Sequence, residues 1–148
     1  MKQLFIAALA TLFIGTSAFA GPAAVNAKVV SHFSAAFKSA KEVTWTATEQ
    51  FNKASFVLNN EQVNAFYDPY GNLIGTSKTM KFDKLPKNAI ETIVSGYSYP
   101  EYQLQECIEF VNAKNETSYY VSMESLNESI ALEISPKGKV SLFNKKWK

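Results

Sequence analysis

The sequence predicts an α+β fold in which two tandem helix-plus-antiparallel-sheet units pack as one domain. The spacing of apolar residues changes from helical to alternating twice along the 148-residue chain, which gives the order helix, four strands, helix, four strands. The turn sequence Asp68-Pro69-Tyr70-Gly71 also has a counterpart in Ser135-Pro136-Lys137-Gly138. We therefore interpret the second half as a repeat of the first, with the repeats at about 26–83 and 84–144.

The first repeat begins with an amphipathic helix over 26–40, for which Asn26 is a suitable N-cap. Alternation then predicts strands at 43–49, 53–58, 62–68 and 73–82, with a tight turn at Asn59-Asn60. Trp45 alternates with Val43 and Ala47, and we expect all three to face inward. Trp45 and Phe37 should then belong to one core.

The second repeat begins with a helix near Pro86, a residue that suits the first helical turn. Its apolar stripe contains Ile90 and Ile93, and Gly96 lies near its end. Alternation resumes afterwards and predicts strands at 102–112, 118–125, 128–135 and 139–144.

The stretch "FYDPYGNLIGT", residues 66–76, contains features of both a turn and a ligand-binding loop. The two copies of the turn keep proline and glycine but exchange Asp68 for Ser135, so the shared residues are those that turn geometry requires. We therefore expect positive φ at Gly71 and Gly138. A calcium loop needs more oxygen ligands at alternating positions than this stretch has, which favours the turn.

Residues 1–20 have the pattern of a secretory signal peptide. Lys2 gives a positive start, Leu4–Ile14 is an apolar run, and Ala18-Phe19-Ala20 fits cleavage after Ala20. Residues 21–148 should then form a single periplasmic or secreted domain. No later segment is apolar enough to span a bilayer, so we expect no stable membrane insertion.

Composition argues against several classes of function. The net charge is only +2 and arginine is absent, which gives no electrostatic case for nucleic acid. His32 is the single histidine and has no clustered carboxylates around it in the sequence, so we expect no metal and no cofactor. Cys107 is the single cysteine, and its alternation phase predicts a partly exposed, inert thiol. The basic ending "NKKWK" is either a solvated tail or a weak contact with a membrane surface.

Five segments together resemble the PepSY-like, putative beta-lactamase-inhibitor-like family of exported bacterial proteins. They are "FSAAFKSAKEVTW", "ASFVLNNEQVNAFYDPYGNLIGT", "LPKNAIETI", "TSYYVSME" and "LEISPKGKV". The resemblance covers most of residues 28–143 and implies a periplasmic α+β protein of two PepSY-type units without catalytic residues. The family's inhibitors present an acidic residue and aromatics from hairpin loops. They also carry disulfides, which this chain cannot form.

The predicted function is a non-catalytic binding or inhibitor-like module that presents an antiparallel sheet and hairpin loops to a protein or peptide partner in the cell envelope. The candidate binding residues are Asp68, Tyr70, Tyr67 and Tyr120. One alternative is a small cone-shaped α+β enzyme in which Glu106, the one carboxylate on an apolar strand face, is the acid or base. Another is a structural envelope protein that forms a homodimer through an exposed sheet edge.

Overall fold

The structure of the chain is a computed structural model that describes residues 25–148. The predicted signal peptide, residues 1–20, lies outside the described residues. Within 25–148 no helix combines the length and the apolar character needed to cross a bilayer.

The described chain is mostly one antiparallel sheet of eight strands, ordered β1 to β8 as in the sequence. The elements are α2 (Ala27–Ala36), β1 (Lys41–Ala47), β2 (Asn52–Leu58), β3 (Glu61–Tyr67), β4 (Leu73–Thr79), the 3-10 turn η2 (Phe82–Lys84), α3 (Lys87–Gly96), β5 (Gln103–Asn112), β6 (Thr117–Glu124), β7 (Glu128–Ile134) and β8 (Val140–Trp147). This corrects the predicted fold class. A single sheet dominates, and the two α-helices are short, with ten residues each.

The chain forms two compact units. Unit 1 runs to Lys78 and includes Asn112–Lys114, and unit 2 contains Thr79–Val111 and Asn115–Lys148. The interpretation of residues 21–148 as a single domain of two repeats, 26–83 and 84–144, stays a prediction.

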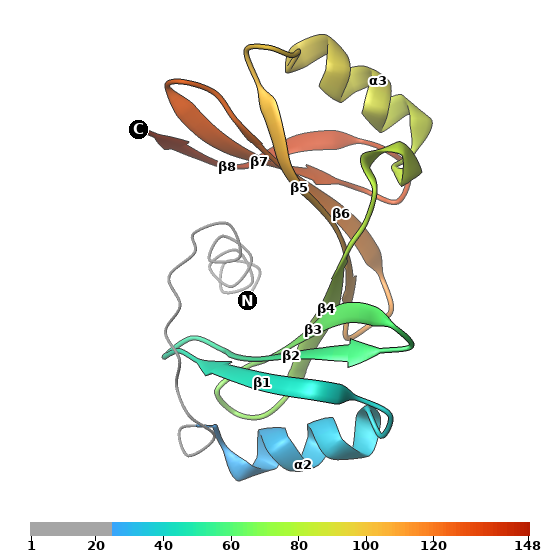
Figure 1. Ribbon diagram of the computed structural model, residues 1–148, viewed down its shortest axis with the longest axis vertical. Coiled ribbons are helices and arrows are strands. Elements are labelled where there is room, and N and C mark those ends of the chain that lie inside the picture. Colours follow the sequence, from blue (N-terminus) through green and yellow to red (C-terminus); the bar gives the residue numbers. More distant parts are fainter. Residues whose placement is uncertain (1–24) are drawn as a thin grey trace. The chain divides into compact units, whose positions relative to one another are not determined.

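In unit 1, α2 covers one face of the neighbouring strands (Figure 1). Asn26 caps the helix, because its side chain accepts a hydrogen bond of 2.9 Å from the Lys28 backbone N–H. The buried cluster beneath α2 consists of Val25, Val29, Phe33, Ala54, Phe56, Val63, Ala65 and Tyr67. The prediction that Trp45 and Phe37 share one core is confirmed. Both pack against this cluster, and each ring lies 5.2 Å from the ring of Phe33.

Two details of unit 1 differ from the prediction. The helix ends at Ala36 rather than at residue 40, although Phe37 and Ala40 still pack against the cluster. The helical spacing of apolar residues therefore extends beyond the end of the helix. Val43 is exposed instead of inward-facing, and it lies at an irregularity of the strand, where the β1–β2 register shifts between Lys41 and Thr44 and Glu42 has a φ of 54°.

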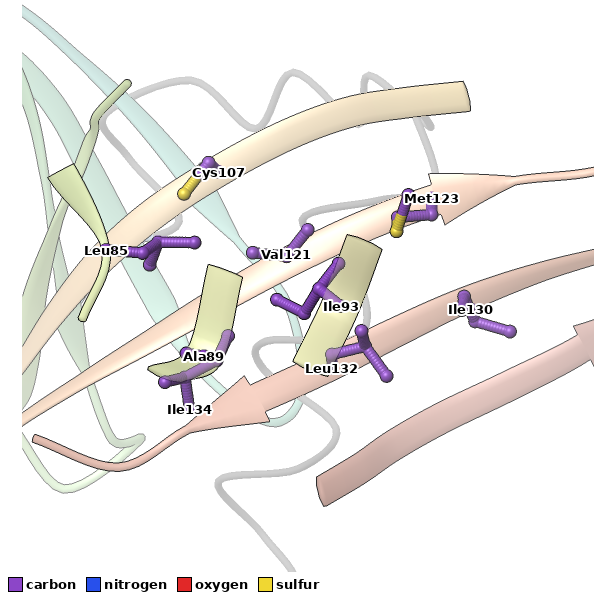
Figure 2. Close-up of a cluster of buried hydrophobic side chains, with 9 residues drawn as sticks. All are labelled: Leu85, Ala89, Ile93, Cys107, Val121, Met123, Ile130, Leu132 and Ile134. Atoms are coloured by element: carbon purple, nitrogen blue, oxygen red, sulfur yellow. The ribbon is translucent and has the colours of Figure 1, made fainter. Parts of the chain in front are cut away.

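In unit 2, α3 packs over one face of β5–β8 (Figure 1). Figure 2 shows the cluster between them, formed by Leu85, Ala89, Ile93, Cys107, Val121, Met123, Ile130, Leu132 and Ile134. The N-terminal residues of α3 contribute Ala89, and Ile93 lies one helical turn further along.

The prediction of a partly exposed Cys107 is wrong, because Cys107 is buried in this cluster. The cause is a register shift in β5. Leu104 pairs with Met123, but Cys107 pairs with Val121, so the residues that face α3 change from even to odd numbers at the irregularity. Burial raises the pKa of the Cys107 thiol to about 11, with a smaller effect from the charge of Glu106.

Candidate functional site

The β3–β4 turn is held closed by the carboxylate of Asp68. One carboxylate oxygen, Oδ1, accepts the backbone N–H of Tyr70 at 2.9 Å and that of Asn72 at 2.8 Å. The other, Oδ2, accepts the side-chain amide of Asn72 at 2.9 Å. Backbone bonds from Asp68 N–H to Asn72 C=O and from Gly71 N–H to Asp68 C=O close the loop. The sequence forms this turn because aspartate satisfies nearby N–H groups and glycine takes the positive φ.

These bonds also determine the charge state of Asp68. Partial burial pushes the pKa of the carboxyl upward, but the hydrogen bonds from Asn72, Tyr70 and Gly71 outweigh it and hold the pKa below the ordinary value. The carboxylate is therefore ionised at neutral pH, with both oxygens already engaged inside the turn. It is a positioning group for the loop.

Tyr70 projects from this turn, and its side chain is 77% exposed. The adjacent Gly71 has φ of +90° and lies against α2, so that a Cβ atom there would approach the side chain of Lys28 to 2.9 Å. The loop that carries Tyr70 is thus fixed both by its own hydrogen bonds and by contact with a helix. An aromatic side chain on such a fixed loop can bind a partner with little loss of backbone entropy.

The β7–β8 turn has the same local geometry. Ser135 Oγ accepts the Lys139 backbone N–H at 3.1 Å, and Gly138 N–H bonds to Ser135 C=O at 2.8 Å. Gly138 has φ of +82°. The expected positive φ at both glycines is confirmed. Here Lys137 occupies the position that Tyr70 has in unit 1, so only the β3–β4 turn presents an aromatic ring.

Tyr67 lies beneath α2 and is completely buried. Its hydroxyl lies 3.2 Å from His32 Nδ1, and burial raises the Tyr67 pKa to about 12. Tyr70, three residues further along the chain, is exposed. The two predicted binding tyrosines of unit 1 therefore do not form one surface. The rings of His32, a residue of α2, and Tyr67 also make a T-shaped contact, at 5.5 Å between centroids.

Tyr120 lies in unit 2 and is also buried. Its hydroxyl donates to Glu133 Oε1 at 2.8 Å, and burial, assisted by this bond, raises the Tyr120 pKa. The rings of Phe110 and Phe143 contact the Tyr120 ring at 6.4 Å and 5.0 Å. The side chain is thus a packed part of unit 2, on the sheet face opposite the cluster that contains Val121.

Glu106, the candidate acid or base, lies on β5 opposite Ser122 of β6. Among residues 25–148 no three histidine, cysteine, aspartate or glutamate side chains converge as they would at a metal site. Ser122 is buried, and its hydroxyl makes no hydrogen bond within the described chain. Glu106 and Ser122 are thus register partners, which places an acid opposite a hydroxyl group, and His32, the single histidine of the chain, is a residue of unit 1.

A cluster of polar and aromatic side chains in unit 2 was not predicted from the sequence. Tyr102 donates to Glu128 Oε1 at 2.6 Å, and Lys145 Nζ lies 2.6 Å from Glu128 Oε2. The hydrogen bond from Lys145, followed by that from Tyr102, lowers the pKa of Glu128. Lys145 also lies 4.0 Å from the centre of the Trp147 ring. The three charged or hydroxyl groups are far apart in sequence, and only the "NKKWK" ending marked the region beforehand.

No family model matches the sequence, and no curated protein matches it. Solved structures do match. A DUF2874 family protein from Bacteroides uniformis has a TM-score of 0.68 at 15% sequence identity, with 83% of this chain and 89% of that chain covered. A protein from Bacteroides eggerthii, provisionally assigned to the periplasm, also has a TM-score of 0.68, at 11% identity and 83% and 88% coverage. A BLIP-like protein from Bacteroides fragilis has a TM-score of 0.63 at 14% identity, with 83% and 86% covered.

The chain shares the fold of these proteins. The BLIP-like part of the predicted resemblance is therefore supported at the level of fold, and the link to PepSY-type units stays a prediction. The provisional periplasmic assignment of one of the similar structures is consistent with the predicted export of this chain.

Proposed function

We propose that this protein is a non-catalytic binding module of the cell envelope, which contacts a protein or peptide partner through the β3–β4 turn. The observation that carries the proposal is the exposed ring of Tyr70 on a turn that Asp68 locks with three hydrogen bonds. Tyrosine is enriched among the residues that dominate binding energy at protein interfaces. The BLIP-like fold supports the proposal, because it makes a hairpin-presenting, inhibitor-like module a reasonable comparison.

The roles of the four candidate residues differ in this proposal. Tyr70 is the contact residue, and Asp68 acts through the loop by fixing the position of Tyr70. Tyr67 and Tyr120 are buried, so they support the strands and do not touch the partner in the described conformation. This division differs from an inhibitor that inserts an acidic side chain into an enzyme, because the Asp68 oxygens are already hydrogen-bonded within the turn.

The test uses protein purified from the exported fraction and compares its capture of partners from an envelope extract with that of Tyr70→Ala. The matched control is Lys137→Ala, which truncates the equivalent exposed position of the β7–β8 turn. We expect Tyr70→Ala to weaken binding by at least about tenfold and Lys137→Ala to leave it unchanged. Equal binding by all three proteins would remove the β3–β4 turn from the interface.

Two further assays separate the proposal from its alternatives. Inhibition of a panel of beta-lactamases that depends on Tyr70 would identify the partner class suggested by the family resemblance. Turnover of a generic ester or peptide that Glu106→Gln abolishes would instead establish an enzyme. Elution at twice the chain mass in size-exclusion chromatography would point to a homodimer, for which the end strands β1 and β8 offer unpaired edges.

A further inference from the structure

Four exposed apolar side chains lie at one end of unit 2. They are Tyr99, Leu104, Leu126 and Trp147, which are 81%, 47%, 91% and 66% exposed. We call them the C-terminal rim. They come from the α3–β5 loop, the start of β5, the β6–β7 turn and the end of β8, all of which lie at the same end of the unit (Figure 1).

Strand pairing brings these residues together. Leu104 pairs with Met123 near the end of β6, and Glu128 at the start of β7 pairs with Trp147. The Tyr102–Glu128 hydrogen bond of 2.6 Å joins the α3–β5 loop to the same end. Since neighbouring strands lie about 4.8 Å apart, the rim extends over about 14 Å from β5 to β8.

The C-terminal residues of the rim are held in place. The backbone N–H of Lys148 donates to Asn127 C=O at 3.0 Å, and Lys148 Nζ bonds to Ser125 C=O at 2.8 Å. Lys148 Nζ also lies 2.6 Å from Glu124 Oε1. Trp147 is thus a fixed, exposed ring between two anchored lysines, which differs from the solvated tail that the sequence also allowed.

Ion pairing leaves little free charge at this end. Lys145 pairs with Glu128 and Lys148 pairs with Glu124. Lys146, next to Trp147, and Glu101, next to Tyr102, add one charge of each sign, and both are exposed. The rim is therefore close to neutral, so a partner that binds it must be recognised mainly through apolar contact.

The high exposure of the rim residues favours a deformable partner that needs no preformed pocket. Residues that dominate protein interfaces usually lie within a packed surround that excludes water. Leu126 is 91% exposed, so it has almost no such surround. Tyrosine and tryptophan prefer the boundary between lipid headgroups and acyl chains, where leucine can insert without a shaped pocket.

From these observations we propose that the C-terminal rim is a peripheral docking surface for a phospholipid bilayer, into which Leu126 and Trp147 insert to a shallow depth. Lys146 lies beside Trp147 in sequence, is exposed, and can reach lipid phosphates from the interface. The rim consists of unit 2 residues and the Tyr70 turn of unit 1 residues, so docking does not depend on the proposed function.

The experiment measures co-sedimentation of the exported protein with vesicles of phosphatidylcholine, and of phosphatidylcholine with phosphatidylglycerol. Intact mass establishes the N-terminus of the purified protein. We expect binding to both vesicle types with weak dependence on salt. Trp147→Ala and Leu126→Ser should each lower the partition coefficient about tenfold. Leu142→Ser, a matched substitution of an exposed leucine on β8 outside the rim, should leave it unchanged.

Fluorescence gives an independent readout. Brominated phospholipid should quench emission from the wild-type protein, and Trp147→Phe should keep vesicle binding but lose most of the quenching, since the other tryptophan, Trp45, packs in unit 1. No sedimentation with either vesicle type would overturn the proposal. Binding that Trp147→Ala and Leu126→Ser leave intact would overturn it as well, and so would a rim-dependent protein partner found without any lipid binding.

Discussion

Gly138 lies so close to Asn88 that a Cβ atom on the glycine would overlap the Asn88 Oδ1 atom. Asn88 is fixed there, because its side-chain amide donates to Lys137 C=O at 3.0 Å. The equivalent glycine of unit 1, Gly71, has a more flexible side chain as its neighbour. A Cβ atom on Gly71 would meet the Lys28 side chain at 2.9 Å, and that flexible stem can move.

Substitution of the two glycines should therefore have unequal effects. Gly71→Ala should cost about 1–2 kcal/mol of unfolding free energy, because alanine is strained at positive φ. Gly138→Ala carries the same strain and in addition displaces the Asn88 amide, so we expect a loss larger by about 1–2 kcal/mol. Urea denaturation of each variant measures the difference.

A double-mutant cycle controls for the steric part of this effect. In an Asn88→Ala background the neighbour is gone, so Gly138→Ala should cost about as much as Gly71→Ala. If Gly138→Ala costs the same with and without Asn88, the close contact does not contribute to stability.

The stabilising effect of Asp68 should depend on pH. Its pKa in the folded protein lies below the ordinary value, so the stabilisation is fully present above the unfolded pKa of about 4 and is lost as the pH falls through the folded pKa. Asp68→Asn should lower stability at pH 7 by roughly 1 kcal/mol, given the partial exposure of the turn. The gap between the two proteins should close in acid.

Ser135→Ala provides the comparison, because Ser135 has the same place in the β7–β8 turn and does not titrate. Its deficit should be constant over the same pH range. A pH-independent deficit for Asp68→Asn as well would show that the charge of Asp68 is unimportant in the turn.

Strand alternation and turn chemistry predicted much of this fold. The Asn59-Asn60 turn forms with φ of 52° and 64°, as asparagine in a tight hairpin favours. The irregularities in β1 and β5 left no mark in the sequence, and the one near Gln105 reversed the faces assigned to Cys107. The first helix was also predicted to be too long, because the helical spacing of apolar residues continues past the end of α2 to Phe37 and Ala40.

The candidate site was predictable only where the turn itself determines exposure. Tyr70 lies at a hairpin tip, and its exposure follows from that position. Tyr67 follows Phe66 on β3, and adjacent strand residues must point to opposite faces. Both are nonetheless buried, at 0% and 1% exposure, because each face of that strand is covered. Alternation separates two faces but does not reveal which of them is accessible.

Phe33 should be a main determinant of stability in unit 1. Its ring contacts those of Phe37, Trp45 and Phe56 at 5.2, 5.2 and 4.9 Å, and only 5% of the residue is exposed. Phe33→Ala should cost about 3–5 kcal/mol, and Trp45→Ala should cost less because Trp45 is half-buried. Denaturant melts give both values. A Phe33→Ala loss below about 1 kcal/mol would mean that α2 is not packed on the sheet as described.

The thiol of Cys107 should be unreactive in the folded protein. Burial raises its pKa to about 11, so the reactive thiolate is almost absent at pH 8, and the side chain is buried in the unit 2 cluster together with Leu85 and Val121 (Figure 2). We expect a disulfide reagent such as DTNB to label the native protein far more slowly than the protein in denaturant. Cys107→Ala should destabilise unit 2 less than Cys107→Ser, because the serine hydroxyl would be buried in apolar surroundings. Labelling at the same rate in native and denatured protein, together with equal stability of the alanine and serine variants, would place Cys107 at the surface, and the face reversal in β5 would then be wrong.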